Sequence, residues 1–99
     1  MVLNESDADQ RAEKILERLG AEFDSEVTFF DGAFGIPTRE DHGDVYIYNW
    51  NSAAYVRSGN IMDQLLSGPI AVPKSGAPAF VLGTASDTEG ELRRRREQA

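Results

Sequence analysis

The chain has 99 residues, of which 40% are hydrophobic and 27% charged, and its formal net charge is −7. This length fits one domain with a modest core, and the apolar content is too high for a fully disordered chain. Because no cysteine is present, disulfides, thiolate metal sites and cysteine nucleophiles are excluded. No run of 18 apolar residues occurs, and the first residues lack the basic and apolar regions of a secretory signal. We therefore predict a cytoplasmic protein without a membrane anchor.

The negative charge is concentrated in the first half of the chain. Residues 1–44 hold 12 acidic and 4 basic side chains, a charge of −8, whereas residues 45–99 hold 5 acidic and 6 basic side chains, a charge of +1. Such a field repels nucleic acid and anionic membranes and would attract a basic protein partner. An acidic surface that only maintains solubility is the alternative.

The first predicted element is an amphipathic helix over residues 6–19. Its apolar residues are spaced 4, 3, 1 and 3 apart, which places them on one stripe of a 3.6-residue helix: Ala8, Ala12, Ile15, Leu16 and Leu19. Ser6 is the predicted N-cap, and Gly20 is the predicted left-handed residue after the last turn. Because a narrow apolar stripe stabilises a helix only when it is buried, we expect this helix to pack on one face of a sheet.

Short strands and turns are predicted for the next part of the chain. A strand over residues 27–30 ends at the turn-forming pair Asp31-Gly32. Residues 33–37 contain glycine and proline and are predicted to be an edge or irregular segment, and residues 38–43 are predicted to be a polar loop. We expect a meander of two or three antiparallel strands over residues 27–50.

The most strand-like stretch is residues 45–50, which contains β-branched and aromatic side chains but no glycine or proline. As a strand it would place Val45 and Ile47 on one face and Tyr46, Tyr48 and Trp50 on the other. We predict a central strand covered on both faces, with a buried helical turn as the alternative. The aromatic face could be a ligand platform, but aromatic side chains on a central strand are more commonly core.

Two short helices are predicted after this strand. Asn51-Ser52 would cap a helix over residues 53–57 that Gly59 ends. Asn60 would cap a second helix that ends at Gly68-Pro69, and its predicted buried face consists of Ile61, Met62, Leu65 and Leu66.

A hairpin and a charged tail complete the chain. Residues 70–72 and 79–83 are the predicted strands of the hairpin, and residues 74–76 are its turn. Residues 87–99 have few apolar side chains and include four consecutive arginines at 93–96, which favours a frayed or charged helix.

Together these elements predict an α+β fold in a single small domain over residues 1–99. The globular part would span about residues 5–86, and residues 87–99 would be a charged C-terminal tail. We expect an antiparallel sheet of four or five strands, with the N-terminal amphipathic helix packed on one face and short helices between strands.

Candidate catalytic and metal-binding residues are sparse. His42 is the only histidine, and Glu40, Asp41 and Asp44 lie too close to it along the chain to share one helical face. A solvated turn is therefore favoured over a loosely bound ion. Neither a nucleophile motif nor a glycine-rich phosphate loop is present, and the arginine run lacks the aromatic neighbours typical of nucleic-acid binding. We expect no enzyme activity, no cofactor and no metal.

Four short motifs follow one another in the second half of the chain. They are YIYNWNS at residues 46–52, YVRSG at residues 55–59, GPIAV at residues 68–72 and VLGT at residues 81–84. Their order and spacing resemble the YrhB-like family, the predicted immunity proteins of bacterial polymorphic toxin systems. The resemblance covers about 40 of the 99 residues, and the predicted N-terminal helix is also expected in that family. Tyr46 stands where we would expect a tryptophan, and the C-terminal tail is more polar.

The resemblance implies an immunity protein that binds one cognate toxin in the cytoplasm and occludes its active site. The acidic half would face a basic surface of the toxin, and Glu40, Asp41 and Asp44 are the predicted contact residues. A general protein-interaction or holdase-like module without one dedicated partner is the alternative. A small-molecule binder would need a deep pocket, which nothing in the sequence predicts. Neither nucleic acid nor a membrane is an expected partner, and the oligomeric state is open.

Overall fold

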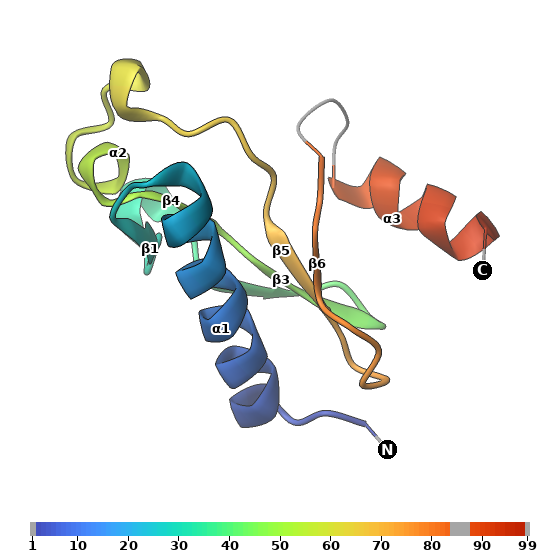
Figure 1. Cartoon of the computed structure of the whole chain (residues 1–99). Helices are drawn as coiled ribbons and strands as arrows, with labels where there is room; N and C mark the ends of the chain where they lie inside the picture. The colour runs from blue at the N-terminus through green and yellow to red at the C-terminus, as the bar shows by residue number, and fades with distance from the viewer. Residues whose placement is uncertain (1, 84–87, 99) are drawn as a thin grey trace.

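The structure is a computed structural model that describes residues 2–83 and 88–98. Helix α1 (Glu5–Phe23) lies across one face of a four-stranded antiparallel sheet (Figure 1). The strand order is β2-β3-β5-β6, with bounds Arg39–Asp41, Val45–Tyr48, Ile70–Pro73 and Phe80–Val81. A two-stranded sheet pairs β1 (Val27–Phe29) with β4 (Trp50–Ser52). The predicted α+β fold is confirmed.

Short helical elements connect the strands. Helix α2 (Ala53–Ser58) follows β4 directly, and two single 3-10 turns, η1 (Ala33–Gly35) and η2 (Ile61–Asp63), lie before β2 and before β5. The C-terminal helix α3 (Thr88–Gln98) has the helical form predicted for this segment. Thr84, Asp87 and Ala99, which belonged to the predicted strand motif and tail, lie outside the described residues.

Helix α1 begins one residue earlier than predicted, and Ser6 is not its N-cap. The cap is Asn4, whose Oδ1 accepts a hydrogen bond from the backbone N–H of Asp7 at 2.8 Å. Asparagine is as good a cap as serine, so the sequence alone did not separate the two candidates.

The helix also continues four residues past its predicted end, because Gly20 is helical. Asp24 takes the left-handed conformation instead, with φ of 49°. A Cβ atom at position 20 would lie 3.1 Å from Val27 Cγ2. Gly20 therefore allows α1 and β1 to approach closely. Close approach of two segments is a common role of glycine, besides the left-handed conformation at a helix end.

The predicted strand over residues 45–50 is divided between the two sheets. Strand β3 ends at Tyr48, and Trp50 begins β4. Between them, the N–H of Asn49 donates to the carbonyl of Thr38 at 2.9 Å, and the carbonyl of Asn49 accepts from the N–H of Phe30 at 3.1 Å. The composition of residues 45–50 correctly indicated an extended backbone. Composition does not indicate which other strand each part of this stretch pairs with.

Two predictions about the preceding region are wrong. Residues 38–43 are not simply a polar loop, because β2 pairs with β3 and places Arg39 opposite Tyr48. The meander is also wrong for its first strand, because β1 pairs with β4 and places Phe29 opposite Trp50. Charged residues are typical of edge strands, so a charged run by itself does not exclude a strand.

Two apolar clusters cover the two faces of the four-stranded sheet. The larger lies under α1 and joins Ala8 and Ala12, both 0% exposed, to Tyr46, Tyr48 and Trp50. The smaller lies on the opposite face, where Leu92 of α3 packs with four residues in or next to the strands: Val45, Ile47, Ala71 and Leu82. The predicted alternation of residues 45–50 is confirmed, and the aromatic face is core.

The predictions for α2 and for the β5–β6 hairpin are confirmed. Ser52 caps α2 by accepting a hydrogen bond from the N–H of Tyr55 at 3.0 Å, and Gly59 ends the helix with φ of 71°. Strands β5 and β6 form the predicted hairpin, with Ile70 opposite Val81.

Candidate functional site

One end of the molecule, which we call the α2 end, displays large apolar side chains to solvent. It comprises residues 20–36 and 53–68, that is, the end of α1 together with β1, η1, α2, η2 and the segment before β5 (Figure 1). Phe34, Ile61, Met62 and Leu66 are 58%, 75%, 85% and 82% exposed. The predicted burial of Ile61, Met62 and Leu66 is therefore wrong. Only Leu65 of that predicted face packs against the core, because η2 is too short to form a continuous helical stripe.

The backbone of the segment that carries Ile61, Met62 and Leu66 is held by two buried polar residues of β4. Asn51 Oδ1 accepts from the N–H of Leu65 at 2.8 Å, and Asn51 Nδ2 donates to the carbonyl of Leu65 at 3.1 Å. Ser52 Oγ donates to the carbonyl of Asp63 at 2.6 Å. Asn51 and Ser52 are 5% and 3% exposed, so water competes little for these bonds. The exposed side chains thus project from a backbone with a defined position.

Gly68 fixes the point where this segment returns to the sheet. Its carbonyl accepts a hydrogen bond from Trp50 Nε1 at 2.9 Å. A Cβ atom at position 68 would collide with the backbone carbonyl of Leu82, so only glycine fits there. The Asn51-Ser52 pair and Gly68, which belong to two of the four sequence motifs, therefore position the α2 end.

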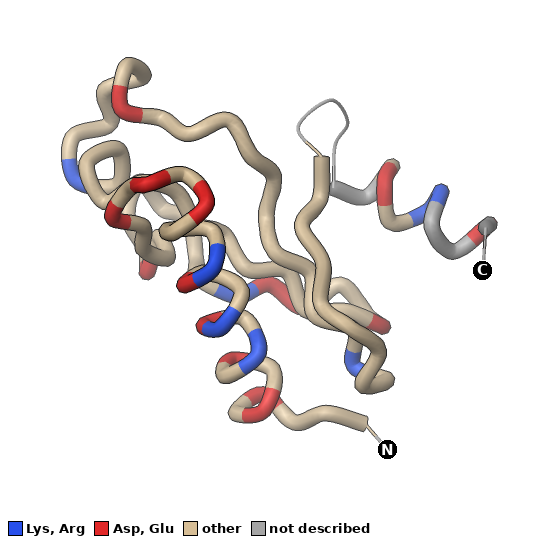
Figure 2. The backbone as a smooth tube through the Cα atoms, viewed as in Figure 1, with Lys and Arg blue, Asp and Glu red and all other residues tan. Residues whose placement is uncertain are grey.

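The α2 end is also acidic. Residues 20–36 and 53–68, all of which the structure describes, contain one cation, Arg57, and five carboxylates: Glu22, Asp24, Glu26, Asp31 and Asp63. Figure 2 shows the acidic residues gathered where α1 ends beside α2. Arg57 Nη2 lies 3.6 Å from Glu26 Oε2, and because both side chains are more than 70% exposed, this pair contributes little stability. The other four carboxylates keep the α2 end negatively charged.

The predicted contact residues Glu40, Asp41 and Asp44 lie at the opposite end, which we call the hairpin end (residues 39–45 and 73–76). The fold brings all three to one β-hairpin, and the side chains of Asp41 and Glu40 form hydrogen bonds within the chain. Asp41 Oδ1 accepts from Lys74 Nζ at 2.7 Å and from the N–H of Gly43 at 2.9 Å. These hydrogen bonds hold the pKa of Asp41 below its usual value.

Glu40 is likewise engaged within the chain. Its Oε2 accepts from Asn49 Nδ2 at 2.7 Å, and its Oε1 lies 3.3 Å from His42 Nε2. Asp44 is exposed. Whether these residues contact a partner stays a prediction, and reversing their charges would also disturb the β2–β3 hairpin.

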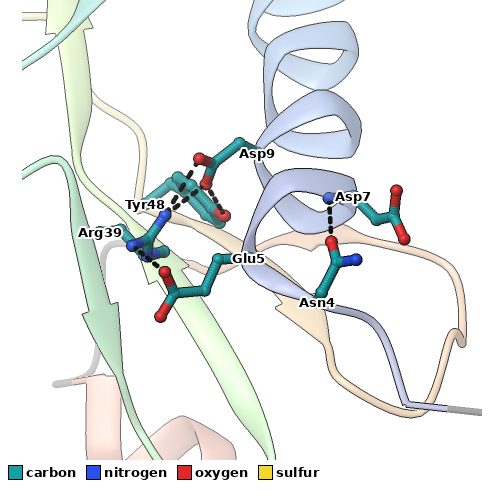
Figure 3. Close-up of polar contacts among 6 residues, drawn as sticks. All are labelled: Asn4, Glu5, Asp7, Asp9, Arg39 and Tyr48. Atoms are coloured by element: carbon teal, nitrogen blue, oxygen red, sulfur yellow. Dashed lines mark hydrogen bonds and ion pairs between the residues drawn. The ribbon is translucent and has the colours of Figure 1, made fainter.

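A polar cluster joins α1 to the sheet beside the hairpin end (Figure 3). Tyr48 Oη donates to Asp9 Oδ1 at 2.6 Å, and Arg39 Nη1 lies 2.8 and 3.0 Å from the two carboxylate oxygens of Asp9. Arg39 Nη2 also donates to Glu5 Oε2 at 2.9 Å. Because Tyr48 is only 1% exposed, its hydroxyl depends on Asp9 for a partner.

The electrostatics of this cluster fit a structural role. Burial raises the pKa of Asp9, but hydrogen bonds from Tyr48 and Arg39 outweigh burial, so the net pKa is lowered. Burial and the hydrogen bond to Asp9 both raise the pKa of Tyr48, so the phenol keeps its proton. Neither group is tuned toward neutral pH, where an acid or base catalyst works best. Among the described residues, no group of three or more metal-ligating side chains is placed to hold an ion.

Comparisons with known proteins return no family model, no curated protein and no solved structure that matches this chain. The resemblance to the YrhB-like family therefore rests on the motifs over residues 46–84. Within the part of the chain that the structure describes, no helix has the length and apolar character needed to cross a membrane.

Proposed function

We propose that this protein is a non-catalytic binding domain whose α2 end docks on a basic protein and occludes it. The observation that carries the proposal is the display of Ile61, Met62 and Leu66, each at least 75% exposed, on a fixed backbone. Large exposed apolar patches with polar rims mark protein-interaction sites. Prior ordering of the segment supports tight binding, because less conformational freedom is lost when the partner docks.

The charge of the α2 end selects the partner's chemistry. The α2 end holds five carboxylates and one cation in addition to its exposed apolar side chains, so a positively charged surface is complementary. The apolar side chains would supply most of the affinity, and the carboxylates would accelerate association. If the α2 end forms the contact, Glu40, Asp41 and Asp44 would act on the partner mainly through the long-range field.

We further propose that the partner is a cognate toxin and that the protein acts in the cytoplasm as its immunity protein, by stoichiometric binding without turnover or cofactor. This part rests on the resemblance to the YrhB-like family. It is supported by the placement of the Asn51-Ser52 pair and Gly68, which hold the proposed binding surface in position. A holdase-like module is the second candidate, because exposed apolar side chains also suit the binding of unfolded chains.

The test uses the product of the gene next to this one, purified as an inactive variant, in titration calorimetry. The double variant Ile61→Asp, Met62→Asp should weaken binding about 100-fold or more, the loss typical of interface anchors. It should also abolish protection of bacteria that express the active toxin. Val2→Asp is the matched control, because Val2 is 74% exposed and lies outside the α2 end.

Three outcomes would decide between the candidates. Wild-type affinity in the double variant would remove the α2 end as the contact. A neighbouring gene product that does not bind would contradict the immunity role. Equal suppression of aggregation for acidic and basic unfolded proteins would favour the holdase.

A further inference from the structure

A second surface, opposite in charge to the α2 end, lies between α1 and the β5–β6 hairpin. A groove of about 660 Å³ opens there, and its exposed lining is mostly apolar. Its lining includes Arg11, Lys14, Ile15, Glu17, Arg18 and Ala79. Figure 2 shows the basic residues of α1 on the side of the helix that faces β5 and β6.

Three cations form the rim of this groove on α1. Arg11, Lys14 and Arg18 are spaced three and four residues apart, so they lie along one side of the helix. Arg11 Nη1 donates to the carbonyl of Gly76 at 3.0 Å and so connects α1 to the β5–β6 turn. Lys14 and Arg18 are exposed and form no ion pair with any residue that the structure describes. Like charges four residues apart repel, and a bound anion would relieve this repulsion.

The other side of the groove leads to the open edge of the four-stranded sheet. Strand β6 is last in the strand order, and no described strand lies beyond it. The N–H of Leu82 donates to Pro69 O at 2.9 Å, so the backbone polar groups of Leu82 point toward the chain that enters β5. Because residues of an antiparallel pair alternate in direction, the N–H and C=O of Val81 face away from β5. The next outward donor, the N–H of Gly83, already donates to Glu91 Oε2 at 2.9 Å.

We propose that this groove binds an extended acidic segment of another protein. The segment would pair with β6 through the backbone of Val81 and place carboxylates against Arg11, Lys14 and Arg18. Its alternate side chains would then lie on the apolar floor at Ile15 and Ala79. A second copy of this chain is a poorer occupant, because pairing two β6 edges would bring the two sets of cations together.

Fluorescence anisotropy with labelled synthetic peptides tests this proposal. The probes are a peptide of alternating valine and glutamate, its valine–lysine counterpart, and acidic peptides N-methylated along one edge or the other. We expect the acidic peptide to bind, the basic peptide not to bind, and methylation of one edge only to abolish binding. Arg18→Glu should weaken binding about tenfold, with Arg57→Glu, also an exposed helical arginine, as the matched control.

The proposal is overturned if both charged peptides bind equally or if Arg18→Glu and Arg57→Glu bind alike. Equal binding of the two methylated peptides would overturn the pairing with β6. Dimerisation of the protein that excludes the peptide would show that a second copy occupies the groove instead. Because residue 18 is exposed, Arg18→Glu should melt like the parent, which separates loss of binding from loss of folding.

Discussion

The hairpin end and the α2 end use polar side chains in opposite ways. At the hairpin end, charged residues pair with one another, as in the 2.7 Å contact between Lys74 Nζ and Asp41 Oδ1. At the α2 end, the buried neutral residues Asn51 and Ser52 hold the backbone, and charged and apolar side chains are left exposed. A charged stretch of sequence therefore indicates a binding surface only where the fold leaves its charges without internal partners.

The prediction that Glu40, Asp41 and Asp44 contact a partner rests on charge alone and stays a prediction. Their density along the chain is high, but Glu40 and Asp41 help to hold β2, β3 and β5 together. The acidic residues of the α2 end are more widely spaced in sequence, and the fold gathers them at the same end of the molecule as exposed apolar side chains.

Removing the support of the α2 end should have the largest effect on stability. Asn51→Ala leaves both backbone polar groups of Leu65 without their partner, so the free energy of unfolding should fall by about 3 kcal/mol. Urea denaturation measures this change. Asn60→Ala is the matched control, because Asn60 is an exposed cap of η2 and its loss should cost about 1 kcal/mol. Equal losses in the two variants would mean that Asn51 does not hold the segment.

The next largest effect is expected at the cluster beside the hairpin end. Asp9→Ala deprives the buried hydroxyl of Tyr48 of its partner and should lower the free energy of unfolding by about 2 kcal/mol. Glu13→Ala, on the same helix but exposed, should change it by less than about 0.5 kcal/mol. In a double-mutant cycle with Tyr48→Phe, the double variant should lose less free energy of unfolding than the sum of the losses in the two single variants. Strict additivity would argue against the coupling of Asp9 and Tyr48.

Acid should destabilise the protein through the carboxylates of Asp9 and Asp41. The pKa values of Asp9 and Asp41 are lowered in the folded protein, so the unfolded chain binds more protons as the pH falls. Their contribution to stability is complete above the ordinary carboxyl pKa of 3.8 and is lost as the pH falls through the lower folded values. Urea titrations toward about pH 3 should therefore show a steeper loss for the parent than for Asp9→Asn.

Asp31→Asn supplies the comparison for this pH dependence. Asp31 lies at the α2 end, and its side chain forms no ion pair with a described residue. This variant removes one carboxylate and leaves the contacts of Asp9 and Asp41 intact. If the pH dependence of stability in Asp9→Asn coincides with that of the parent and of Asp31→Asn, the cluster does not contribute to acid sensitivity.

The smallest effect is expected for the exposed side chains of the α2 end. Met62→Ser should change the free energy of unfolding by less than about 0.5 kcal/mol, because Met62 is 85% exposed. Leu65→Ser, three residues away, should lower it by about 2 kcal/mol because Leu65 packs against the core. Thermal unfolding of the two variants gives the contrast directly. A large loss for Met62→Ser would place that side chain in the core and would remove the main support for the proposed surface.

Local sequence patterns determined a definite part of this protein. The spacing of Ala8, Ala12 and Leu19 predicted the buried face of α1, and alternation predicted the two faces of β3. Ser52 and Gly59 predicted the ends of α2. These features depend on residues a few positions apart, whose relative directions are set by the helical and extended backbone periods.

Only the tertiary structure decided how distant segments meet. The pairing of β1 with β4 and the contact of Asp9 with Arg39 and Tyr48 join residues that are far apart in sequence. The exposure of Ile61, Met62 and Leu66 was decided in the same way, by Asn51 and Ser52 of β4. Apolar character favours burial, but the hydrogen bonds of the backbone determine whether a side chain points toward the core, and those bonds come from residues 11 and 14 positions away.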